Sequence, residues 1–402
     1  MEETVSTRRE FVAQCAGIAS VASSAARAND CVRFGLIGAG GRGTEILQAA
    51  LHCPNAEAVA IADLYTRRLD AAKHLVPDAA AYQDYRRLLD DKSIDAVLIA
   101  TPHHQHALNF VAAVEAGKDV YVEKTMAFHA DHARRMKRAY SGSGRIVQVG
   151  SQATSGPAVA QVNQFYTADR MGKVTAIHTH HYRNEPYGGW KRQIPEDCDL
   201  QHVAWTAFEG EVPHRDFDPN RFINWRFFWD YPGGNVFENM VHQVIFWHKM
   251  LELGAPRTVT MAGGNYLSPD MEVPDTYEVA MDYGTLLFSW SSMFGNSYYG
   301  ETTDELLGTK GTISRYADEQ VSFEPQATDK SAVSVKGSGT GVGDQQLTLL
   351  HMNNFFDCVR SRKEPNCPFE LGLSSAIACR MAVTSYRLGR TVRWDSEREQ
   401  II

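Results

Sequence analysis

The stretch Val32-Arg33-Phe34-Gly35-Leu36-Ile37-Gly38-Ala39-Gly40-Gly41-Arg42-Gly43 decides the fold of this 402-residue chain. Its first half is a strand-like apolar run, and its second half matches G-x-G-x-x-G. Gly38 permits a tight turn, Gly40 lets the backbone approach a pyrophosphate, and Gly43 lets a helix pack closely. A second apolar run ends at Asp63, twenty residues after Gly43. The pattern predicts dinucleotide binding, with Asp63 accepting hydrogen bonds from a ribose and repelling a 2′-phosphate, which favours NAD over NADP.

Strand-like and helix-like segments alternate from residue 31 to residue 150. We predict strands at 32–37, 56–62, 94–100, 120–122 and 145–149, and helices at 66–75, 85–91, 105–116 and 131–140. This alternation predicts a doubly wound parallel sheet, an α/β Rossmann domain. Ligands bind such sheets at the carboxyl ends of the strands, where Gly38, Asp63, Thr101, Glu123 and Lys124 follow.

The pattern changes after residue 150. Strands are expected at 174–182, 259–262, 276–283 and 285–290, helices at 239–253, 351–362 and 371–388, and a loop at 328–345. Residues 151–395 are therefore predicted to form an α+β domain for substrate binding and oligomerisation, with an open, mostly antiparallel sheet and closing C-terminal helices. An open sheet needs covering, so we expect a homo-oligomer, a dimer or a tetramer.

The first 28 residues resemble a bacterial twin-arginine export signal. Arg8 and Arg9 precede an Ala- and Ser-rich stretch, and Ala26-Arg27-Ala28 fits a cleavage site. The alternative interpretation of these residues is a mildly amphipathic N-terminal tail. Export would place the protein in the periplasm or outside the cell, and without it the protein would be cytoplasmic. Because this route carries folded proteins, an exported dinucleotide enzyme would have to hold its cofactor tightly and recycle it.

Composition and charge exclude several classes of protein. A net charge of −8 argues against nucleic acid or an anionic membrane as partner, and no apolar run approaches the ~20 residues of a membrane span. The seven cysteines form no C-x-x-C pair, so no zinc site or redox dithiol is indicated, although one disulfide stays open. His178, His180 and His181 could suggest a metal, but without nearby acids we predict none.

Taken in order, these motifs resemble those of the Gfo/Idh/MocA oxidoreductases. The resemblance rests on the glycine loop, Asp63, the segments 100–106 (Ala-Thr-Pro-His-His-Gln-His) and 122–124 (Val-Glu-Lys), and the closing segments 308–313 and 386–392. It covers about residues 31–395 and implies an NAD cofactor. The cofactor contacts that it implies are Gly38, Gly40, Gly41, Arg42, Gly43, Asp63, Thr101, Pro102, His106, Glu123, Lys124 and Gln152.

The resemblance also implies three catalytic residues. Lys124 corresponds to the lysine of a Glu-Lys-Pro signature, and Thr125 stands here in place of the proline. The Lys124 ammonium would stabilise the negative charge that develops on the substrate oxygen. Glu238 and His242 follow a glycine pair at a spacing that puts them on one helix face. His242 would take the hydroxyl proton, since histidine titrates near neutrality. Glu238 stands where the family usually has the shorter Asp.

Aromatic side chains interleaved with polar ones are expected around the substrate. Sugar rings stack on aromatic faces while their hydroxyls need hydrogen-bonding partners. The alternative reading of such aromatic residues is hydrophobic core. The candidate substrate contacts are Tyr182, Arg183, Trp190, Trp225, Arg226 and Tyr299.

The favoured function is that of an NAD-dependent oxidoreductase acting on a hydroxyl of a sugar, glycoside or polyol, with tightly bound, recycled NAD. One alternative is redox-neutral glycoside hydrolysis through oxidation, elimination, hydration and re-reduction. The Asn-x-Tyr-Pro-Thr-His stretch of such α-N-acetylgalactosaminidases is absent here, where residues 237–242 read Phe-Glu-Asn-Met-Val-His. A second alternative is a non-catalytic NAD-binding scaffold or regulatory protein, against which the retention of Lys124 and His242 speaks.

Overall fold

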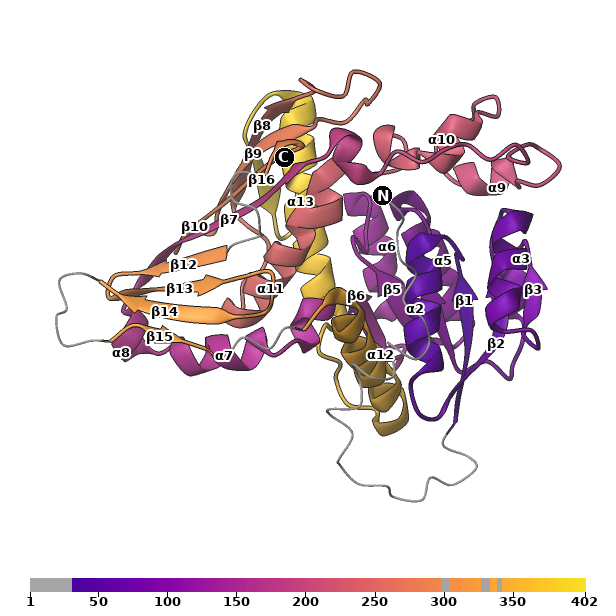
Figure 1. Ribbon diagram of the computed structural model, residues 1–402, viewed down its shortest axis with the longest axis horizontal. Helices are drawn as coiled ribbons and strands as arrows, with labels where there is room; N and C mark the ends of the chain where they lie inside the picture. The colour runs from indigo at the N-terminus through magenta and orange to yellow at the C-terminus, as the bar shows by residue number, and fades with distance from the viewer. Residues whose placement is uncertain (1–30, 298–303, 327–332, 338–341) are drawn as a thin grey trace.

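The computed structural model describes residues 31–297, 304–326, 333–337 and 342–402 (Figure 1). The expected export signal and Tyr299 lie outside these residues. Figure 1 shows two sheets side by side, with the N-terminal elements in indigo and purple and the second sheet in magenta and orange.

The N-terminal sheet has six parallel strands in the order β3-β2-β1-β4-β5-β6. This confirms the predicted Rossmann fold. Its third strand is too short to have been expected, because only three residues, Ala80–Tyr82, extend the sheet there. The strands are β1 (Val32–Ile37), β2 (Ala56–Ala62), β3, β4 (Ala96–Ile99), β5 (Asp119–Glu123) and β6 (Val147–Gly150), and the helices are α2 (Gly41–Leu51), α3 (Thr66–Leu75), α4 (Tyr85–Leu89), α5 (His103–Glu115) and α6 (Ala130–Tyr140).

The second sheet is mixed and open, in the order β15-β14-β13-β12-β7-β10-β9-β8-β16-β17, with β11 paired to β7. The pairing of β10 with β7 is parallel, and the other described pairings of this sheet are antiparallel, as expected. Its strands are β7 (Val174–Asn184), β8 (Thr258–Gly264), β9 (Thr276–Asp282), β10 (Leu287–Met293), β11 (Gly295–Asn296), β12 (Asp304–Gly308), β13 (Gly311–Arg315), β14 (Val321–Pro325), β15 (Val335–Lys336), β16 (Val392–Asp395) and β17 (Gln400–Ile401).

Helices of the C-terminal half pack on both sheets. They are α7 (Ala158–Phe165), α8 (Ala168–Met171), α9 (Trp205–Glu209), α10 (Pro219–Ile223), α11 (Val241–Leu251), α12 (Asp344–Ser361) and α13 (Phe369–Leu388). Helix α12 returns to the Rossmann domain, where the ring of Phe356 lies 5.3 Å from that of Phe34 on β1. The division of the chain near residue 150 stays a prediction.

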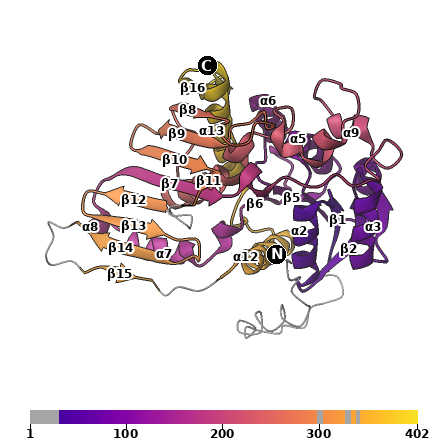
Figure 2. The same ribbon diagram turned by 45° about the horizontal axis from the view of Figure 1, so that its top comes forward.

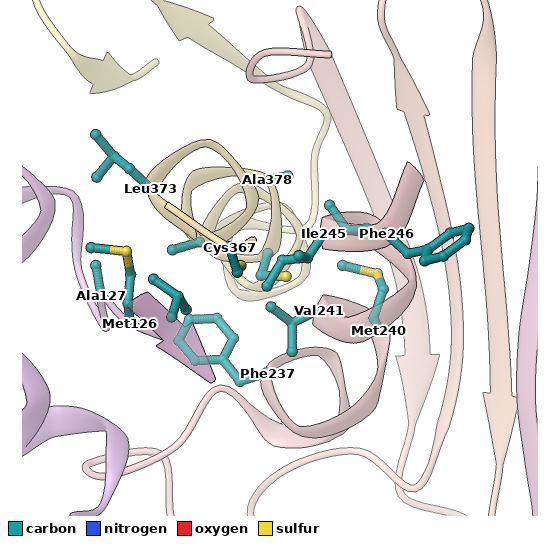
Figure 3. Close-up of a cluster of buried hydrophobic side chains, with 14 of the residues drawn as sticks. Met126, Ala127, Phe237, Met240, Val241, Ile245, Phe246, Cys367, Leu373 and Ala378 are labelled. Carbon is teal, nitrogen blue, oxygen red and sulfur yellow. The ribbon is translucent and has the colours of Figure 1, made fainter. Parts of the chain in front are cut away.

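A buried apolar cluster holds the start of α11 against α13. Figure 3 shows Phe237, Val241 and Ile245 directed toward the helix that carries Ala378. These four residues are at most 1% exposed. Burying one large apolar side chain contributes about 1.5–3 kcal/mol, so the backbone just before α11 is firmly placed. That backbone carries Glu238.

Within the described ranges, no helix is both long and apolar enough to cross a lipid bilayer. Six cysteines lie in these ranges, and all six are free thiols.

Candidate active site

A cleft of about 790 Å³ lies at the carboxyl ends of the Rossmann strands. Its other wall comes from residues 190–242 of the C-terminal half. The cleft therefore brings together residues that are far apart in the sequence. The predicted site residues that line it are Gly38, Gly40, Gly41, Arg42, Asp63, Thr101, Pro102, Glu123, Lys124, Gln152, Trp190, Trp225, Arg226, Glu238 and His242.

The glycine loop leaves room for a pyrophosphate. A Cβ atom on Gly43 would lie 1.9 Å from the Gly38 carbonyl oxygen, and one on Gly38 would lie 2.8 Å from that of Ala100, so both glycines are needed for packing. A Cβ atom on Gly41, by contrast, meets nothing within 4 Å. Helix α2 begins at Gly41 without a side-chain cap. Its first N–H groups can therefore bind an anion, which fits a dinucleotide.

Asp63 lies beside this loop at the end of β2. Its carboxylate accepts hydrogen bonds from the backbone N–H groups of Ala39 at 2.7 Å and Tyr65 at 2.9 Å. A carboxylate has further lone pairs to offer, so the fixed Asp63 can also accept from ribose hydroxyls. This placement fits NAD, as the sequence indicated.

Arg42 joins the glycine loop to the end of β5. Its Nε donates to Glu123 Oε1 at 2.7 Å, and Glu123 is only 4% exposed. Burial works against the charge of Arg42, but the Glu123 carboxylate raises its pKa above the ordinary value. The pair fixes the first turn of α2 next to Lys124.

Glu238 is the centre of a charged cluster in the cleft. Its Oε2 accepts a hydrogen bond from Lys124 Nζ at 2.9 Å, and its Oε1 accepts one from Arg226 Nε at 2.8 Å. His103 Nε2 lies 3.7 Å from the same Oε1. Burial alone would raise the pKa of Glu238, but Arg226 and Lys124 hold that pKa well below its ordinary value. The carboxylate is thus ionised and held in place from two sides.

Glu238 belongs to a π-helical turn, Val236–Met240, that leads into α11. Such turns are rare and often mark functional sites. The sequence predicted an uninterrupted α-helix from residue 239. In the structure, α11 begins only at Val241, because each backbone hydrogen bond of the preceding π-helical turn spans one residue more than in an α-helix. Glu238 and His242 nevertheless both line the cleft.

His242 differs from the expectation that it titrates near neutrality. Burial, followed by the charges of Lys124 and Arg42, lowers the pKa of His242 well below 6.5. The imidazole is therefore neutral at physiological pH, which is the form that can accept a proton.

The Lys124–Thr125 peptide bond is cis. Thr125 Oγ1 donates to the Phe237 carbonyl oxygen at 2.8 Å, which ties the lysine loop to the π-helical turn. The ring nitrogens of His106 lie 2.9 Å from the Thr125 carbonyl oxygen and 2.7 Å from that of Thr101.

Several predicted contacts do not line the cleft. Gly43 and His106 are buried beneath it, where they support the loops around the cofactor site. Tyr182 and Arg183 lie at the end of β7, next to residues that line the cleft: Tyr182 Oη lies 2.7 Å from Ser291 Oγ, and the Arg183 guanidinium carbon lies 5.5 Å from the centre of the Trp190 ring. Contact of these two residues with a substrate stays a prediction.

His103 is a cleft residue that the sequence reasoning passed over. It opens α5 within the quoted Ala-Thr-Pro-His-His-Gln-His segment, which was the available signal. Its ring lies 5.2 Å from that of Trp225, and burial lowers its pKa well below 6.5. Arg68 and Asn239 also line the cleft without having been predicted.

Among the residues that the structure describes, no group of three or more His, Cys, Asp or Glu side chains could hold a metal ion. His178 is exposed on β7, whereas His180 and His181 are partly buried.

Known proteins resemble this chain most clearly in its N-terminal domain. Residues 32–151 match the family model GFO_IDH_MocA, described as an oxidoreductase family with an NAD-binding Rossmann fold. Inositol 2-dehydrogenase of Salmonella typhimurium is 30% identical over 155 residues, which cover 38% of this chain and 46% of that protein. The similarity thus spans about half the length of that relative.

Two further comparisons cover nearly the whole chain. The NAD⁺-dependent scyllo-inositol 2-dehydrogenase of Bacillus subtilis is 23% identical over 86% of this chain and 91% of its own length. A structure of levoglucosan dehydrogenase in complex with NADH and levoglucosan superimposes with a TM-score of 0.72 at 18% identity, covering 90% of this chain and 99% of that chain. At this identity, the structure establishes a shared fold. The glycine loop, Asp63 and the family match thus agree that residues 32–151 form an NAD-binding Rossmann domain similar to that of the Gfo/Idh/MocA oxidoreductases.

Proposed function

We propose that this protein is an NAD-dependent oxidoreductase that acts on a hydroxyl of a sugar, glycoside or polyol. The observation that carries the proposal is the cluster of Lys124, Glu238 and His242 in the same cleft as the glycine loop. The names of the inositol and levoglucosan dehydrogenases agree with a hydroxylated ring as substrate.

NAD, when bound, supplies the acceptor for the hydride that leaves a carbinol carbon. Glu238 holds the Lys124 ammonium in the cleft, where it can donate a hydrogen bond to the substrate oxygen and stabilise negative charge on it. The neutral imidazole of His242 can take the hydroxyl proton. Trp225 and Trp190 offer apolar faces to the ring, and Arg226, which packs on Trp225, donates to Glu238.

Replacing the two proposed catalytic side chains tests this assignment. Lys124→Ala and His242→Ala should each abolish turnover of sugars and polyols while NADH binding, followed by fluorescence, stays within a few-fold of wild type. Unchanged turnover in both variants would contradict the assignment and favour a scaffold or regulatory role.

Redox-neutral glycoside hydrolysis is a second candidate, favoured by the presence of two imidazoles in the cleft, His103 and His242. After oxidation of a hydroxyl, elimination needs a base for the proton next to the new carbonyl, in addition to the group that took the hydroxyl proton. The aglycone then leaves, water adds to the double bond, and the hydride returns.

The NAD content after native purification and dialysis, together with the reaction that the protein catalyses, separates the two candidates. About one NAD per chain, with cleavage of glycosides in the absence of added cofactor, would support the closed cycle and agree with export of a loaded enzyme. An empty protein that forms NADH from free sugars would support an ordinary dehydrogenase.

A further inference from the structure

Arg226 belongs to a long excursion of the chain between β7 and α11. Figures 1 and 2 show helix α9 of this excursion beside the Rossmann helices, away from the second sheet. The chain returns toward α11 through a short 3₁₀-helix, Trp225–Phe227, in which Trp225 and Phe227 are buried. The Phe227 carbonyl oxygen accepts a hydrogen bond from the Glu272 backbone N–H at 2.8 Å. The backbone that carries Arg226 is therefore fixed at the wall of the cleft.

The Arg226 guanidinium is held on two sides. Its Nε donates to Glu238 Oε1 at 2.8 Å, and its central carbon lies 4.3 Å from the centre of the Trp225 ring. Within the described part of the chain, neither of its two Nη groups has a hydrogen-bonding partner. The side chain is 32% exposed and lines the cleft. The two Nη groups are thus donors without an acceptor, on a side chain whose orientation is already fixed.

The charged cluster around Glu238 carries one positive charge in excess. Lys124 and Arg226 are its two cations, and Glu238, whose pKa is held well below its ordinary value, is its carboxylate. Burial lowers the pKa of both His103 and His242, so these two imidazoles are neutral. One cation is therefore uncompensated in a cleft that shields it from part of the solvent, and a bound anion would balance it.

Two further arginines lie near this cluster. Arg192 lines the cleft, and its Nη1 donates to the Gly189 carbonyl oxygen at 2.6 Å. Arg183 donates through Nη1 to the Gly188 carbonyl oxygen, also at 2.6 Å. Neither arginine forms an ion pair with another residue that the structure describes. The substrate end of the cleft is therefore surrounded by positive charge, and a cleft of this kind attracts anions.

The pyrophosphate of the cofactor does not account for Arg226. That group belongs at the glycine loop, where the Arg68 guanidinium lies 4.0 Å from the position that a Cβ atom on Gly40 would take. Arg226 instead shares the Glu238 carboxylate with Lys124, the residue proposed to contact the reacting oxygen. The anion that fits Arg226 is therefore part of the substrate.

We propose that the substrate carries a carboxylate and that Arg226 binds it through its two Nη groups. The inference rests on the proposed function, because it takes the cleft as the place where a hydroxyl is oxidised. The flat guanidinium fork matches a carboxylate, which accepts two parallel hydrogen bonds and carries the single negative charge that the cluster lacks.

The position of the carboxylate on the substrate follows from the two oxygens of Glu238. Lys124 donates to Oε2 and Arg226 donates to Oε1, so the two cations lie at different points of the cleft. The carboxylate is therefore attached to a carbon other than the one that loses the hydride. The substrate class is that of sugar acids, such as uronic acids, rather than neutral sugars or polyols.

Matched substrates test the assignment. Each set holds a uronic acid, its uncharged primary amide and its parent sugar, in the gluco, galacto and manno series. Reduction of the cofactor, bound or added, is followed by absorbance. We expect the wild type to prefer the acid in kcat/KM by about ten-fold to a hundred-fold over the amide and the sugar of the same series, as charge-assisted hydrogen bonds predict. The difference should appear mainly in KM.

Replacing Arg226 separates substrate recognition from support of Glu238. Arg226→Met keeps an unbranched side chain on Trp225 and should bring the acid-to-amide ratio of kcat/KM to within two-fold of one. Lost support of Glu238 would slow all substrates alike, so it would not change this ratio. Arg226→Lys keeps the charge without the fork and should lose part of the preference. Arg215→Met, which removes an exposed arginine paired with Asp230 outside the cleft, is the matched control and should keep the wild-type ratio.

Equal kcat/KM of the wild type for acid and amide, or an acid preference that survives in Arg226→Met, would overturn the carboxylate assignment. An unchanged ratio in Arg226→Lys has the same meaning if Arg226→Met does not fold. A higher kcat/KM for glucose 6-phosphate than for the uronic acid of its series would also overturn it. Wild type that oxidises the parent sugars without preferring the acids would leave the proposed function standing, whereas wild type that oxidises no member of any set would refute the proposed function itself.

Discussion

The two ends of the cleft are built in different ways. At the nucleotide end, the groups that face the ligand are mostly backbone atoms of one continuous segment, residues 38–43, with Asp63 behind them. At the substrate end they are side chains: Lys124 and Glu238 are separated by 114 residues and meet only in the folded chain. Local chemistry fixes the first end and long-range packing fixes the second, so the two ends should respond differently to substitution.

The largest effect is expected at the nucleotide end, from Gly43→Ala. The added Cβ would lie 1.9 Å from the Gly38 carbonyl oxygen, so the first turn of α2 must move away from β1. Overpacking of this kind costs about 3 kcal/mol of folding stability, and NADH binding should fall below detection. Chemical denaturation and NADH titration measure the two effects.

Gly41→Ala is the matched control, because its Cβ meets nothing within 4 Å. If Gly41→Ala and Gly43→Ala lose the same stability, close helix packing is not what this loop requires.

Arg42 connects the nucleotide end and the substrate end of the cleft, and its replacement should have the second-largest effect on stability. Arg42→Met leaves the Glu123 carboxylate buried without its 2.7 Å partner. We expect a loss of about 2 kcal/mol in the free energy of unfolding, below the 3–5 kcal/mol of fully buried pairs because Arg42 is partly exposed. Arg33→Met removes an exposed ion pair with Glu57 and should cost less than about 0.5 kcal/mol. Equal losses in these variants would mean that burial of Glu123 has no role.

The sequence predicted the nucleotide end more completely than the substrate end, for a physical reason. Gly38 and Gly40 act through backbone geometry, and Asp63 is recognised by its distance from them along the chain, so all three can be identified from the sequence. His103 lies in the segment 100–106 that the sequence singled out, but it joins the substrate end only because its ring packs against Trp225, a contact between residues far apart in the sequence. The contacts of residues 202–204 were missed for the same reason, since these residues follow residue 150 in the sequence but form backbone hydrogen bonds with Leu64 and Thr66.

The substrate end should respond to a change of a single methylene. Glu238→Asp shortens the carboxylate that now reaches both Lys124 and Arg226, so one hydrogen bond is lost. The loss of one such bond is worth about 1.4 kcal/mol, or about ten-fold in kcat, with NADH affinity unchanged. Steady-state kinetics with the best substrate found, beside NADH titration, measures both. A fall in NADH affinity with kcat unchanged would assign Glu238 to the nucleotide end.

The most gradual effect should appear in the dependence of stability on pH. Burial lowers the pKa of His103, His104 and His242 below 6.5 in the folded chain, whereas in the unfolded chain they titrate near that value. Below pH 6.5 the unfolded state therefore binds more protons than the folded state. Each histidine then lowers the free energy of unfolding by up to about 1.4 kcal/mol per pH unit. Stability should be constant from pH 8 to 7 and fall from 6.5 toward 5, as measured by urea denaturation at each pH.

The depressed pKa of Glu238 adds nothing in that interval, because a carboxylate of this kind loses its contribution only as the pH falls below about 4.5. His104→Gln should flatten the acid slope by the share of one histidine, since the buried His104 ring lies against the Phe208 carbonyl oxygen and outside the charged cluster. An unchanged slope would mean that His104 binds protons equally in the folded and unfolded states, so that burial does not keep its ring neutral.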